Sequence, residues 1–196
     1  MCRNSIYLAL VSFLLPALLA GPDRASAQPV KELREVRTIL PGVLTTAGGS
    51  GGMNSLDQGQ IQVLCKEGYS TVYYLYAEKF SNPGLNDCGV NKTDYLLARF
   101  EGEHIRPIFT RVKQVVEQGG GPVMAHCWNG RHASGAVAAK AFMQFCDWSA
   151  ERAVEYWLLH AGSDGPAFKF VIRDIRGFAP YSDLKLTTAD QARLCP

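Results

Sequence analysis

The stretch "PVMAHCWNGRHASGAVAAKAFMQFC", residues 122–146, predicts a strand, a short loop and a helix in direct succession. Its first residues are a short apolar run, which is typical of a buried strand. Its second half is rich in alanine and places Val137, Ala141 and Phe145 on one face at helical spacing. The loop between the two elements begins at Cys127. A strand that leads straight into a helix is the basic unit of an α/β domain.

The chain on either side of this stretch continues the alternation. Pro41-Gly42 separates two short extended segments, and Ser55 is the expected N-cap of the helix that follows. We therefore expect an α/β fold with a central, mostly parallel sheet flanked by helices, in which ligands bind at the carboxyl ends of the strands. Further strands are predicted over 70–77, 95–100 and 122–126, helices over 56–67, 105–118, 134–146, 150–161 and 168–176, and a loop over 81–94.

The loop that begins at Cys127 has the chemistry of an anion site. At a helix entry the backbone N–H groups have no intrahelical partners, and the positive end of the helix dipole lies behind them. Anions bind there without side chains. A cysteine in this place is stabilised as the thiolate and is nucleophilic at neutral pH, whereas the alternative is an inert buried thiol. Gly130 allows the tight turn and the close approach of the backbone to a ligand.

At this loop the chain resembles the protein tyrosine and dual-specificity phosphatase superfamily. The motif of that family is His-Cys, five residues, then Arg followed by Ser or Thr, and His126, Cys127, Gly130 and Ser134-Gly135 match it in register. Upstream, "LPGVLTTAGG", a helix and then "EGYSTVYYL" are similar to the start of small dual-specificity-type domains. The resemblance covers roughly residues 38–178 and implies a cysteine phosphatase-like fold with the cysteine loop at a strand-to-helix junction.

The resemblance also implies roles for residues of the loop. Cys127 would attack the phosphorus and form a phosphocysteine, Ser134 would help the thiolate leave in the second step, and His126 would orient the loop. No cofactor and no metal are implied, and the histidines show no metal-ligand spacing with the cysteines. The catalytic residue is then Cys127, and the phosphate-binding residues are Trp128, Asn129, Gly130, Arg131, His132, Ala133 and Ser134.

Ala133 departs from the family pattern, because it stands where the family carries its arginine. That arginine clamps two phosphoryl oxygens and stabilises charge in the transition state. Loss of about 3 kcal/mol would slow the reaction about 150-fold. Arg131 lies two positions earlier; it either reaches the phosphoryl group or is a solvated residue of the rim.

The general acid of the family is an aspartate upstream of the cysteine, and three carboxylates are candidates for it here. Asp94 has the more family-like separation from Cys127, whereas Glu101 and Glu103 are better placed between a strand and its helix. None lies in a recognisable signature, so the sequence leaves the acid open.

Three functions fit these residues. The first is cysteine-dependent phosphomonoester hydrolysis of the dual-specificity or tyrosine phosphatase type, weak or divergent because the loop lacks its arginine. The second is a non-catalytic pseudophosphatase that binds a phosphorylated or anionic ligand. The third is a rhodanese-type sulfurtransferase, which also carries a cysteine on an anion-binding loop. Whether the chain is an enzyme, and which substrate it takes, stay open at this point.

Residues 1–27 have the pattern of a cleavable secretion signal. Arg3 precedes the apolar run 6–20, and Ala25-Ser26-Ala27 is an A-x-A cleavage site. The run is short for a membrane span of about 20 residues, so we expect no stable span after cleavage. Residues 28–196 are then a single phosphatase-like domain in an exported protein, periplasmic or secreted.

Cysteine content and charge complete the picture. Of the six cysteines only Cys2 lies in the signal, so an odd number remains and at least one thiol stays free, for which Cys127 is the candidate. The other four allow three pairings, among which we favour Cys65–Cys88 with Cys146–Cys195. The formal net charge of +2 and the absence of a Lys/Arg cluster give no indication of nucleic acid as a partner. The oligomeric state is open.

Overall fold

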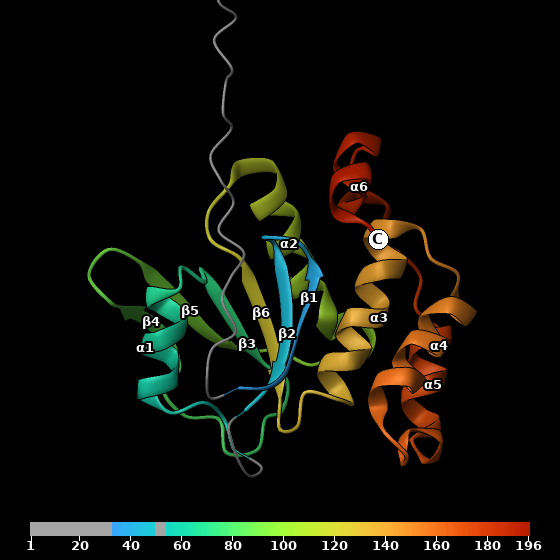
Figure 1. Cartoon of the computed structure of the whole chain (residues 1–196), viewed down its shortest axis with the longest axis horizontal. Helices are drawn as coiled ribbons and strands as arrows, with labels where there is room; N and C mark the ends of the chain where they lie inside the picture. Colours follow the sequence, from blue (N-terminus) through green and yellow to red (C-terminus); the bar gives the residue numbers. More distant parts are fainter. Residues whose placement is uncertain (1–32, 50–53) are drawn as a thin grey trace, which may run out of the picture.

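Six strands form one sheet in the order β1-β2-β6-β3-β5-β4. A computed structural model describes residues 33–49 and 54–196 (Figure 1). The predicted signal over 1–27 and the predicted mature start at Gln28 lie outside these residues. No helix in 33–49 and 54–196 is long and apolar enough to cross a membrane. The strands are β1 Arg34–Leu40, β2 Leu44–Gly48, β3 Thr71–Tyr74, β4 Gly84–Asp87, β5 Lys92–Leu97 and β6 Val123–Cys127.

The centre of the sheet is parallel, as expected, and each edge is an antiparallel hairpin. β2, β6, β3 and β5 run side by side in the same direction, while β1 pairs with β2 and β4 with β5 in the opposite sense. In the register of β2 with β6, Gly48 lies beside Cys127 at the carboxyl ends of both strands. Cys127 therefore lies at the carboxyl ends of the parallel strands, where the sequence analysis predicts that ligands bind.

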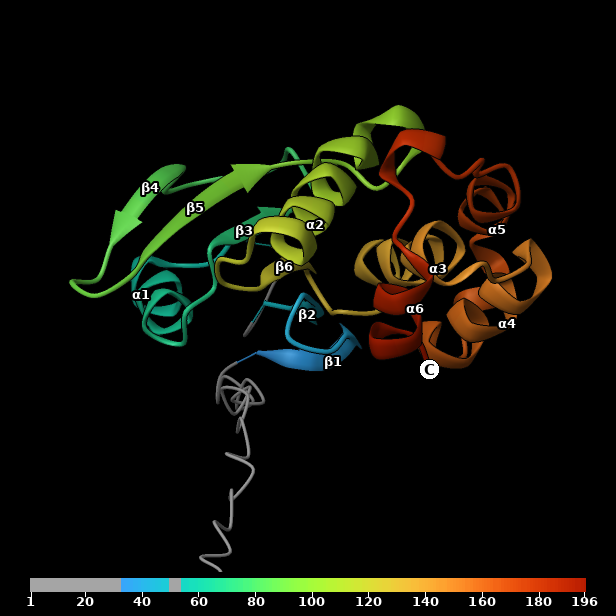
Figure 2. The same cartoon turned by 90° about the horizontal axis from the view of Figure 1, so that it is seen from above.

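Helices cover both faces of the sheet (Figures 1 and 2). On one face Leu64 of α1 packs in a cluster with Tyr74 and Tyr95 of the sheet. On the other face α2 and α3 contact the sheet, and α4 and α5 pack against the outer side of α3. The helices are α1 Gln58–Lys66, α2 Arg106–Gln118, α3 Ala133–Cys146, α4 Ala150–Ala161, α5 Lys169–Arg176 and α6 Thr188–Leu194, with short 3-10 helices η1 Gly102–Ile105, η2 Gly165–Ala167 and η3 Ser182–Leu184.

The small residues of α3 are explained by its central position. The first thirteen residues of this helix are all buried, because the sheet lies on one side of it and α4 and α5 lie on the other. A side chain added at Gly135 would stand 3.2 Å from the indole of Trp157, a fully buried residue of α4. Alanine and glycine thus let α4 approach α3 closely, and the helix that follows the cysteine loop is held rigidly.

Two sequence expectations are wrong. Residues 81–94 are not a loop, because β4 and the start of β5 form a hairpin there, which pairs with the sheet edge and is covered by α1. The N-cap of α1 is Asp57 and not Ser55. The Asp57 carboxylate accepts from the Gln60 amide while the Gln60 side chain accepts from the Asp57 amide, and the Ser55 hydroxyl bonds instead to Ser81.

Two disulfides join the pairs favoured from the sequence. Cys65 in α1 is bonded to Cys88 in the β4–β5 turn, and Cys146 at the end of α3 is bonded to Cys195 after α6. The first ties the edge hairpin to the helix that covers it, and the second ties the C-terminus to the central helix. Among the described cysteines only Cys127 is free.

Candidate active site

Cys127 is the last residue of β6, and the short loop after it leads directly into α3. The thiol is buried, with 2% of the residue exposed. Its Sγ lies 3.2 Å from the Ser134 hydroxyl, in the first turn of α3. His132, the N-cap of α3, supplies no side-chain acceptor to the helix. The first-turn amides therefore remain available to an anion beside the thiol.

Two glycines bring the loop into contact with the end of β2. A Cβ added at Gly48 would lie 2.4 Å from the carbonyl carbon of Asn129 and from the amide nitrogen of Gly130. Gly130 has a φ of 76°, a conformation that favours glycine. The Gly49 amide donates to the Cys127 carbonyl over 2.9 Å. The backbone of β2 thus supports the loop from behind.

We expect Gly48→Ala to distort this loop. The added methyl group meets backbone on two sides, so the loop must shift, and overpacking of this kind costs about 1–3 kcal/mol of unfolding free energy. Phosphate affinity, measured by calorimetry, should fall together with the melting temperature. Gly59→Ala, at an exposed position of α1, is the matched control and should leave phosphate affinity unchanged. Wild-type phosphate binding by Gly48→Ala would show that the contact with β2 does not shape the loop.

His126 is a neutral residue at the entry to the loop. It is fully buried, and burial lowers its pKa to about 3. Its Nε2 lies 2.9 Å from the Tyr95 Oη, which accepts a hydrogen bond from the Leu56 amide and so has its own proton free for the histidine. The rings of Tyr74 and Tyr95 stack on His126, with centroids 5.0 and 5.7 Å away. His126 is therefore an uncharged side chain whose hydrogen bond to Tyr95 links β6 to β5.

Trp128 and His132 anchor the two ends of the loop. The Trp128 indole donates to the Tyr74 Oη over 2.6 Å and packs on the Tyr76 ring at 4.5 Å. The His132 ring packs on Phe168 at 4.0 Å, and its carbonyl accepts from the Trp157 indole over 3.0 Å. One end of the loop is thus held by Tyr74, the last residue of β3, and by Tyr76 after it. The other end is held by α4 and by the start of α5.

Arg131 lies on the rim of the loop and is paired with Glu35 of β1. Its Nε and Nη2 lie 3.3 and 3.1 Å from one carboxylate oxygen of Glu35, and its side chain is 48% exposed. Arg37 bonds the other oxygen of Glu35 at 2.5 Å and donates to the Gly130 carbonyl over 2.6 Å. Arg34, Glu35, Asn129 and Arg131 line a cavity of about 500 Å³. In this arrangement the Arg131 guanidinium binds a carboxylate of the protein and not the interior of the loop.

Ala133 is the first residue of α3 and is completely buried. Its methyl group belongs to the apolar core that also contains Cys127. The position of the family arginine thus carries no hydrogen-bond donor apart from its backbone. The donors that remain at this place are backbone amides and the Ser134 hydroxyl.

Solved structures with this architecture place the loop in a known fold. The core catalytic domain of the PP-IP phosphatase SIW14 from S. cerevisiae matches with a TM-score of 0.52 at 13% identity, over 74% of this chain and 86% of that one. A second structure of the Siw14 catalytic core matches with a TM-score of 0.52 at 13% identity, over 81% and 90%. The chain has the cysteine-phosphatase fold.

P. aeruginosa TpbA matches with a TM-score of 0.48 at 16% identity, over 77% of this chain and 92% of that one. No protein-family model and no curated protein sequence matches the chain. At these identities the likeness concerns the fold alone.

Strand register decides where Asp94, the first of the three candidates for the general acid, lies relative to Cys127. Asp94 pairs with Thr71, which pairs with Val123, so Asp94 lies level with the start of β6. Cys127 is four residues further along β6, about 13 Å away at the usual rise of a strand. Asp94 is therefore at the wrong end of the sheet to protonate a leaving group in the loop, although its separation in sequence was the more family-like one.

Glu101 follows β5 at the same end of the sheet as Cys127. It lines a cavity of about 110 Å³ together with Tyr76, whose ring packs on Trp128 in the loop. Burial raises the pKa of Tyr76, and nearby Cys127 and Glu101 raise it further, so both groups lie within electrostatic reach of the Tyr76 hydroxyl. Glu103 instead lines a different cavity, of about 200 Å³, with Tyr181. Of the three, Glu101 is the carboxylate that the fold brings toward the loop.

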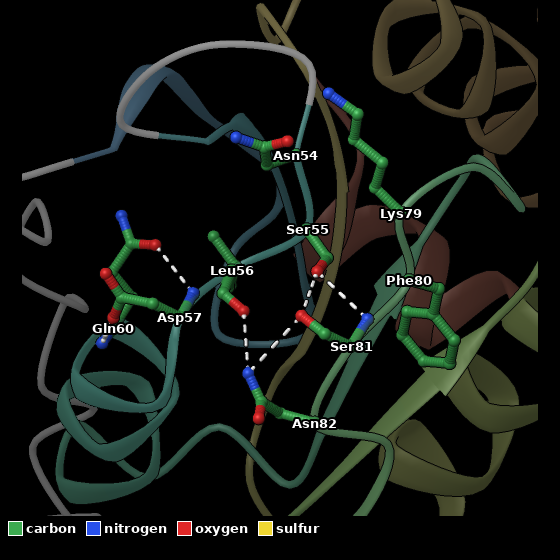
Figure 3. A pocket seen from close by; sticks show the side chains of 9 residues that line it. All are labelled: Asn54, Ser55, Leu56, Asp57, Gln60, Lys79, Phe80, Ser81 and Asn82. Carbon is green, nitrogen blue, oxygen red and sulfur yellow. Dashed lines mark hydrogen bonds between the residues drawn. The ribbon is translucent and has the colours of Figure 1, made fainter.

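A polar pocket of about 530 Å³ lies between the segments that follow β2 and β3, and the sequence interpretation did not include it. Figure 3 shows Ser55 bonded to Ser81, and Asn82 bonded to the Leu56 carbonyl and to Ser81. Its signal in the sequence is weak, because Ser and Asn are common in any loop. The residues that line it are Asn54, Ser55, Leu56, Asp57, Gln60, Lys79, Phe80, Ser81 and Asn82.

No group of three or more His, Cys, Asp or Glu side chains within 33–49 and 54–196 is arranged to hold a metal ion.

Proposed function

We propose that this chain is a divergent cysteine-dependent phosphatase that binds a phosphomonoester in the loop 127–134 and hydrolyses it slowly. One observation carries this proposal. A free thiol, buried at the carboxyl end of β6, lies 3.2 Å from a hydroxyl in the first turn of the helix that the loop enters. The fold shared with a PP-IP phosphatase supports phosphate chemistry at such a loop.

The proposed reaction has two steps. The Cys127 thiolate attacks phosphorus, the S–P bond forms, and the P–O bond to the leaving group breaks while Glu101 donates a proton to the leaving oxygen. Water then attacks the phosphocysteine and passes its proton to the solvent as the S–P bond breaks and phosphate leaves, and Glu101 takes up a proton from the solvent before the next turnover. The Ser134 hydroxyl donates to the thiolate as it departs. The loop amides hold the phosphoryl oxygens in both steps.

The proposed rate is low because of Ala133. A guanidinium at this place would form two charge-assisted hydrogen bonds to the phosphoryl group in the transition state. Removal of a single such donor costs about 10²–10³-fold in turnover in enzymes that use them. Arg131 does not substitute for it while it is paired with Glu35.

A non-catalytic binder of phosphorylated or anionic ligands is the second candidate function, and the buried methyl group of Ala133 favours it. The loop keeps the amides that bind an anion and lacks the group that stabilises the transition state. Hydrolysis and binding differ in outcome, so one experiment separates them.

The experiment measures p-nitrophenyl phosphate hydrolysis and inorganic phosphate binding on the same reduced protein. Phosphate binding with steady release of p-nitrophenol supports the phosphatase. Phosphate binding without turnover supports the binder and rules out the enzyme. Absence of both would overturn the proposal of a functional loop.

We further propose that the protein acts outside the cytoplasm, in the periplasm or after secretion. The predicted signal over 1–27 and two disulfides among four of its cysteines support export. Its ligands would then be phosphoesters or anionic partners of that compartment. Mass spectrometry of the exported protein should find Gln28 at its N-terminus.

We expect Glu101→Gln to slow hydrolysis of phenyl phosphate about 100-fold, the usual contribution of a general acid. Phenolate is a poor leaving group and needs a proton, whereas p-nitrophenolate leaves readily without one, so turnover of p-nitrophenyl phosphate should change little. Glu103→Gln is the matched control, since its carboxylate faces a different cavity. Equal loss on both substrates would contradict the assignment of Glu101 as the acid.

A further inference from the structure

A fully buried lysine lies in the middle of α3. Lys140 is 0% exposed, and its Nζ donates to the Phe100 carbonyl over 2.7 Å. It also forms an ion pair with Asp174 of α5, whose side chain is 18% exposed. Burial lowers the pKa of Lys140, and the hydrogen bond that Lys140 donates to Asp174 offsets part of this effect.

The same ion pair is hydrogen-bonded to the backbone on both sides of Glu101. Lys140 holds the carbonyl of Phe100, the residue before it. The other carboxylate oxygen of Asp174 accepts from the amide of Gly102, the residue after it, over 3.1 Å. α3 and α5 thus converge on the one segment that carries the candidate acid.

Stability alone does not account for a charge at this position. Removing an ammonium and a carboxylate from water costs several kcal/mol for each ion, and a well-packed apolar side chain usually replaces such a pair without loss. The residues on either side of Lys140 in α3, Ala139 and Ala141, are apolar and belong to the hydrophobic core. The lysine supplies something that an apolar residue lacks, namely a donor aimed at the Phe100 carbonyl.

α3 connects this ion pair to the cysteine loop. The helix begins at Ala133, where the cysteine loop ends, and reaches Lys140 after seven residues, about 10 Å. One rigid, buried helix therefore carries the anion-binding turn at its start and the anchor of the segment 100–102 two turns later. α3 and α5 thus link the cysteine loop to the segment of Glu101.

We propose that Lys140 and Asp174 are positioning residues that hold Glu101 at the distance from Cys127 at which it protonates the leaving group. This inference rests on the proposed phosphatase function. Neither residue touches the substrate. Loss of the pair should act only through the proton donor, so its effect depends on how much the leaving group needs a proton.

The test compares Lys140→Met with wild type on phenyl phosphate and p-nitrophenyl phosphate. We expect kcat on phenyl phosphate to fall about 10-fold, with KM unchanged, and kcat on p-nitrophenyl phosphate to change less than about 3-fold. In a Glu101→Gln background Lys140→Met should have no further effect on either substrate. The double variant K140M/D174N, which leaves no unpaired buried charge, carries the same test if Lys140→Met does not fold.

Gln144→Met is the matched control. Gln144 is buried one turn further along α3 and bonds both backbone groups of Tyr181, at 3.0 and 2.7 Å, so it is a similar polar anchor that leads away from Glu101. We expect it to lower the melting temperature and to leave the ratio of the two rates as in wild type. Equal loss of both rates in Lys140→Met, or the same change of ratio in Gln144→Met, would overturn the positioning role while the phosphatase stands. An inactive wild type would overturn the proposed function and the positioning role with it.

Discussion

Cys127→Ser is expected to lower hydrolysis of aryl phosphates by roughly four orders of magnitude or more, which for a slow enzyme means below detection. The serine oxygen is a far weaker nucleophile at neutral pH than a thiolate, because the alcohol stays protonated. The amides of the loop are untouched, so inorganic phosphate should still bind. Stopped assays with phenyl phosphate and calorimetry with phosphate measure the two properties separately.

Ser134→Ala is the control for this substitution. It removes the hydroxyl 3.2 Å from the Cys127 Sγ and keeps the thiol, so the first step should survive and the second should slow. Rapid mixing with p-nitrophenyl phosphate should then show a burst of product, and mass spectrometry of quenched protein should find one phosphoryl group on Cys127. Residual turnover of Cys127→Ser equal to that of wild type would show that the thiol is not the nucleophile and that another protein or site causes the activity.

Ala133→Arg is expected to raise turnover of aryl phosphates about 10- to 100-fold. The substitution restores a planar guanidinium at the place where it can bind two phosphoryl oxygens in the transition state, a contribution of about 3 kcal/mol in comparable sites. Ala133 is completely buried, so the new side chain has to extend along the loop toward the anion. Steady-state kinetics and phosphate affinity should be measured on the same preparations as the melting temperature, which reports any overpacking.

Ala133→Lys is the matched variant that tests whether the paired donors of a guanidinium are needed, or only a positive charge. It adds a similar charge on a flexible stem but only a point donor, so it should tighten phosphate binding with a smaller gain in turnover. If Ala133→Arg keeps its fold and binds phosphate more tightly yet hydrolyses no faster, the missing arginine is not what limits catalysis. The chain would then be a binder for reasons that lie elsewhere in the site.

The parts of the fold that were predicted correctly are those whose signals are local. The β6–loop–α3 unit is contiguous, and the apolar periodicity of α2 is strong enough to place its ends within a residue or two. The β4–β5 hairpin was missed because Gly, Asn and Asp dominate its sequence. Its strands are stabilised by pairing with the sheet edge and by α1 above them, neither of which is visible in a local window.

The candidate site likewise has one part that local sequence predicts and one part that depends on tertiary contacts. Cys127, the loop after it and the absence of an arginine at position 133 can all be read within eight consecutive residues. The acid cannot, because Asp94 and Glu101 are only seven residues apart in sequence, whereas Asp94 lies near the start of β5 and Glu101 follows the end of that strand. Strand register decides between them, and register depends on contacts of β5 with β3 and of β3 with β6.

The sequence by itself determined that this protein carries a cysteine at the entry to a helix within an α/β domain, because backbone geometry at a strand-to-helix turn follows from neighbouring residues. Only the tertiary structure decided that Arg131 is held by Glu35, a residue 96 positions away, and that one buried ion pair between α3 and α5 grips the segment of Glu101. Contacts of that kind depend on which elements pack together, and packing is a property of the whole chain.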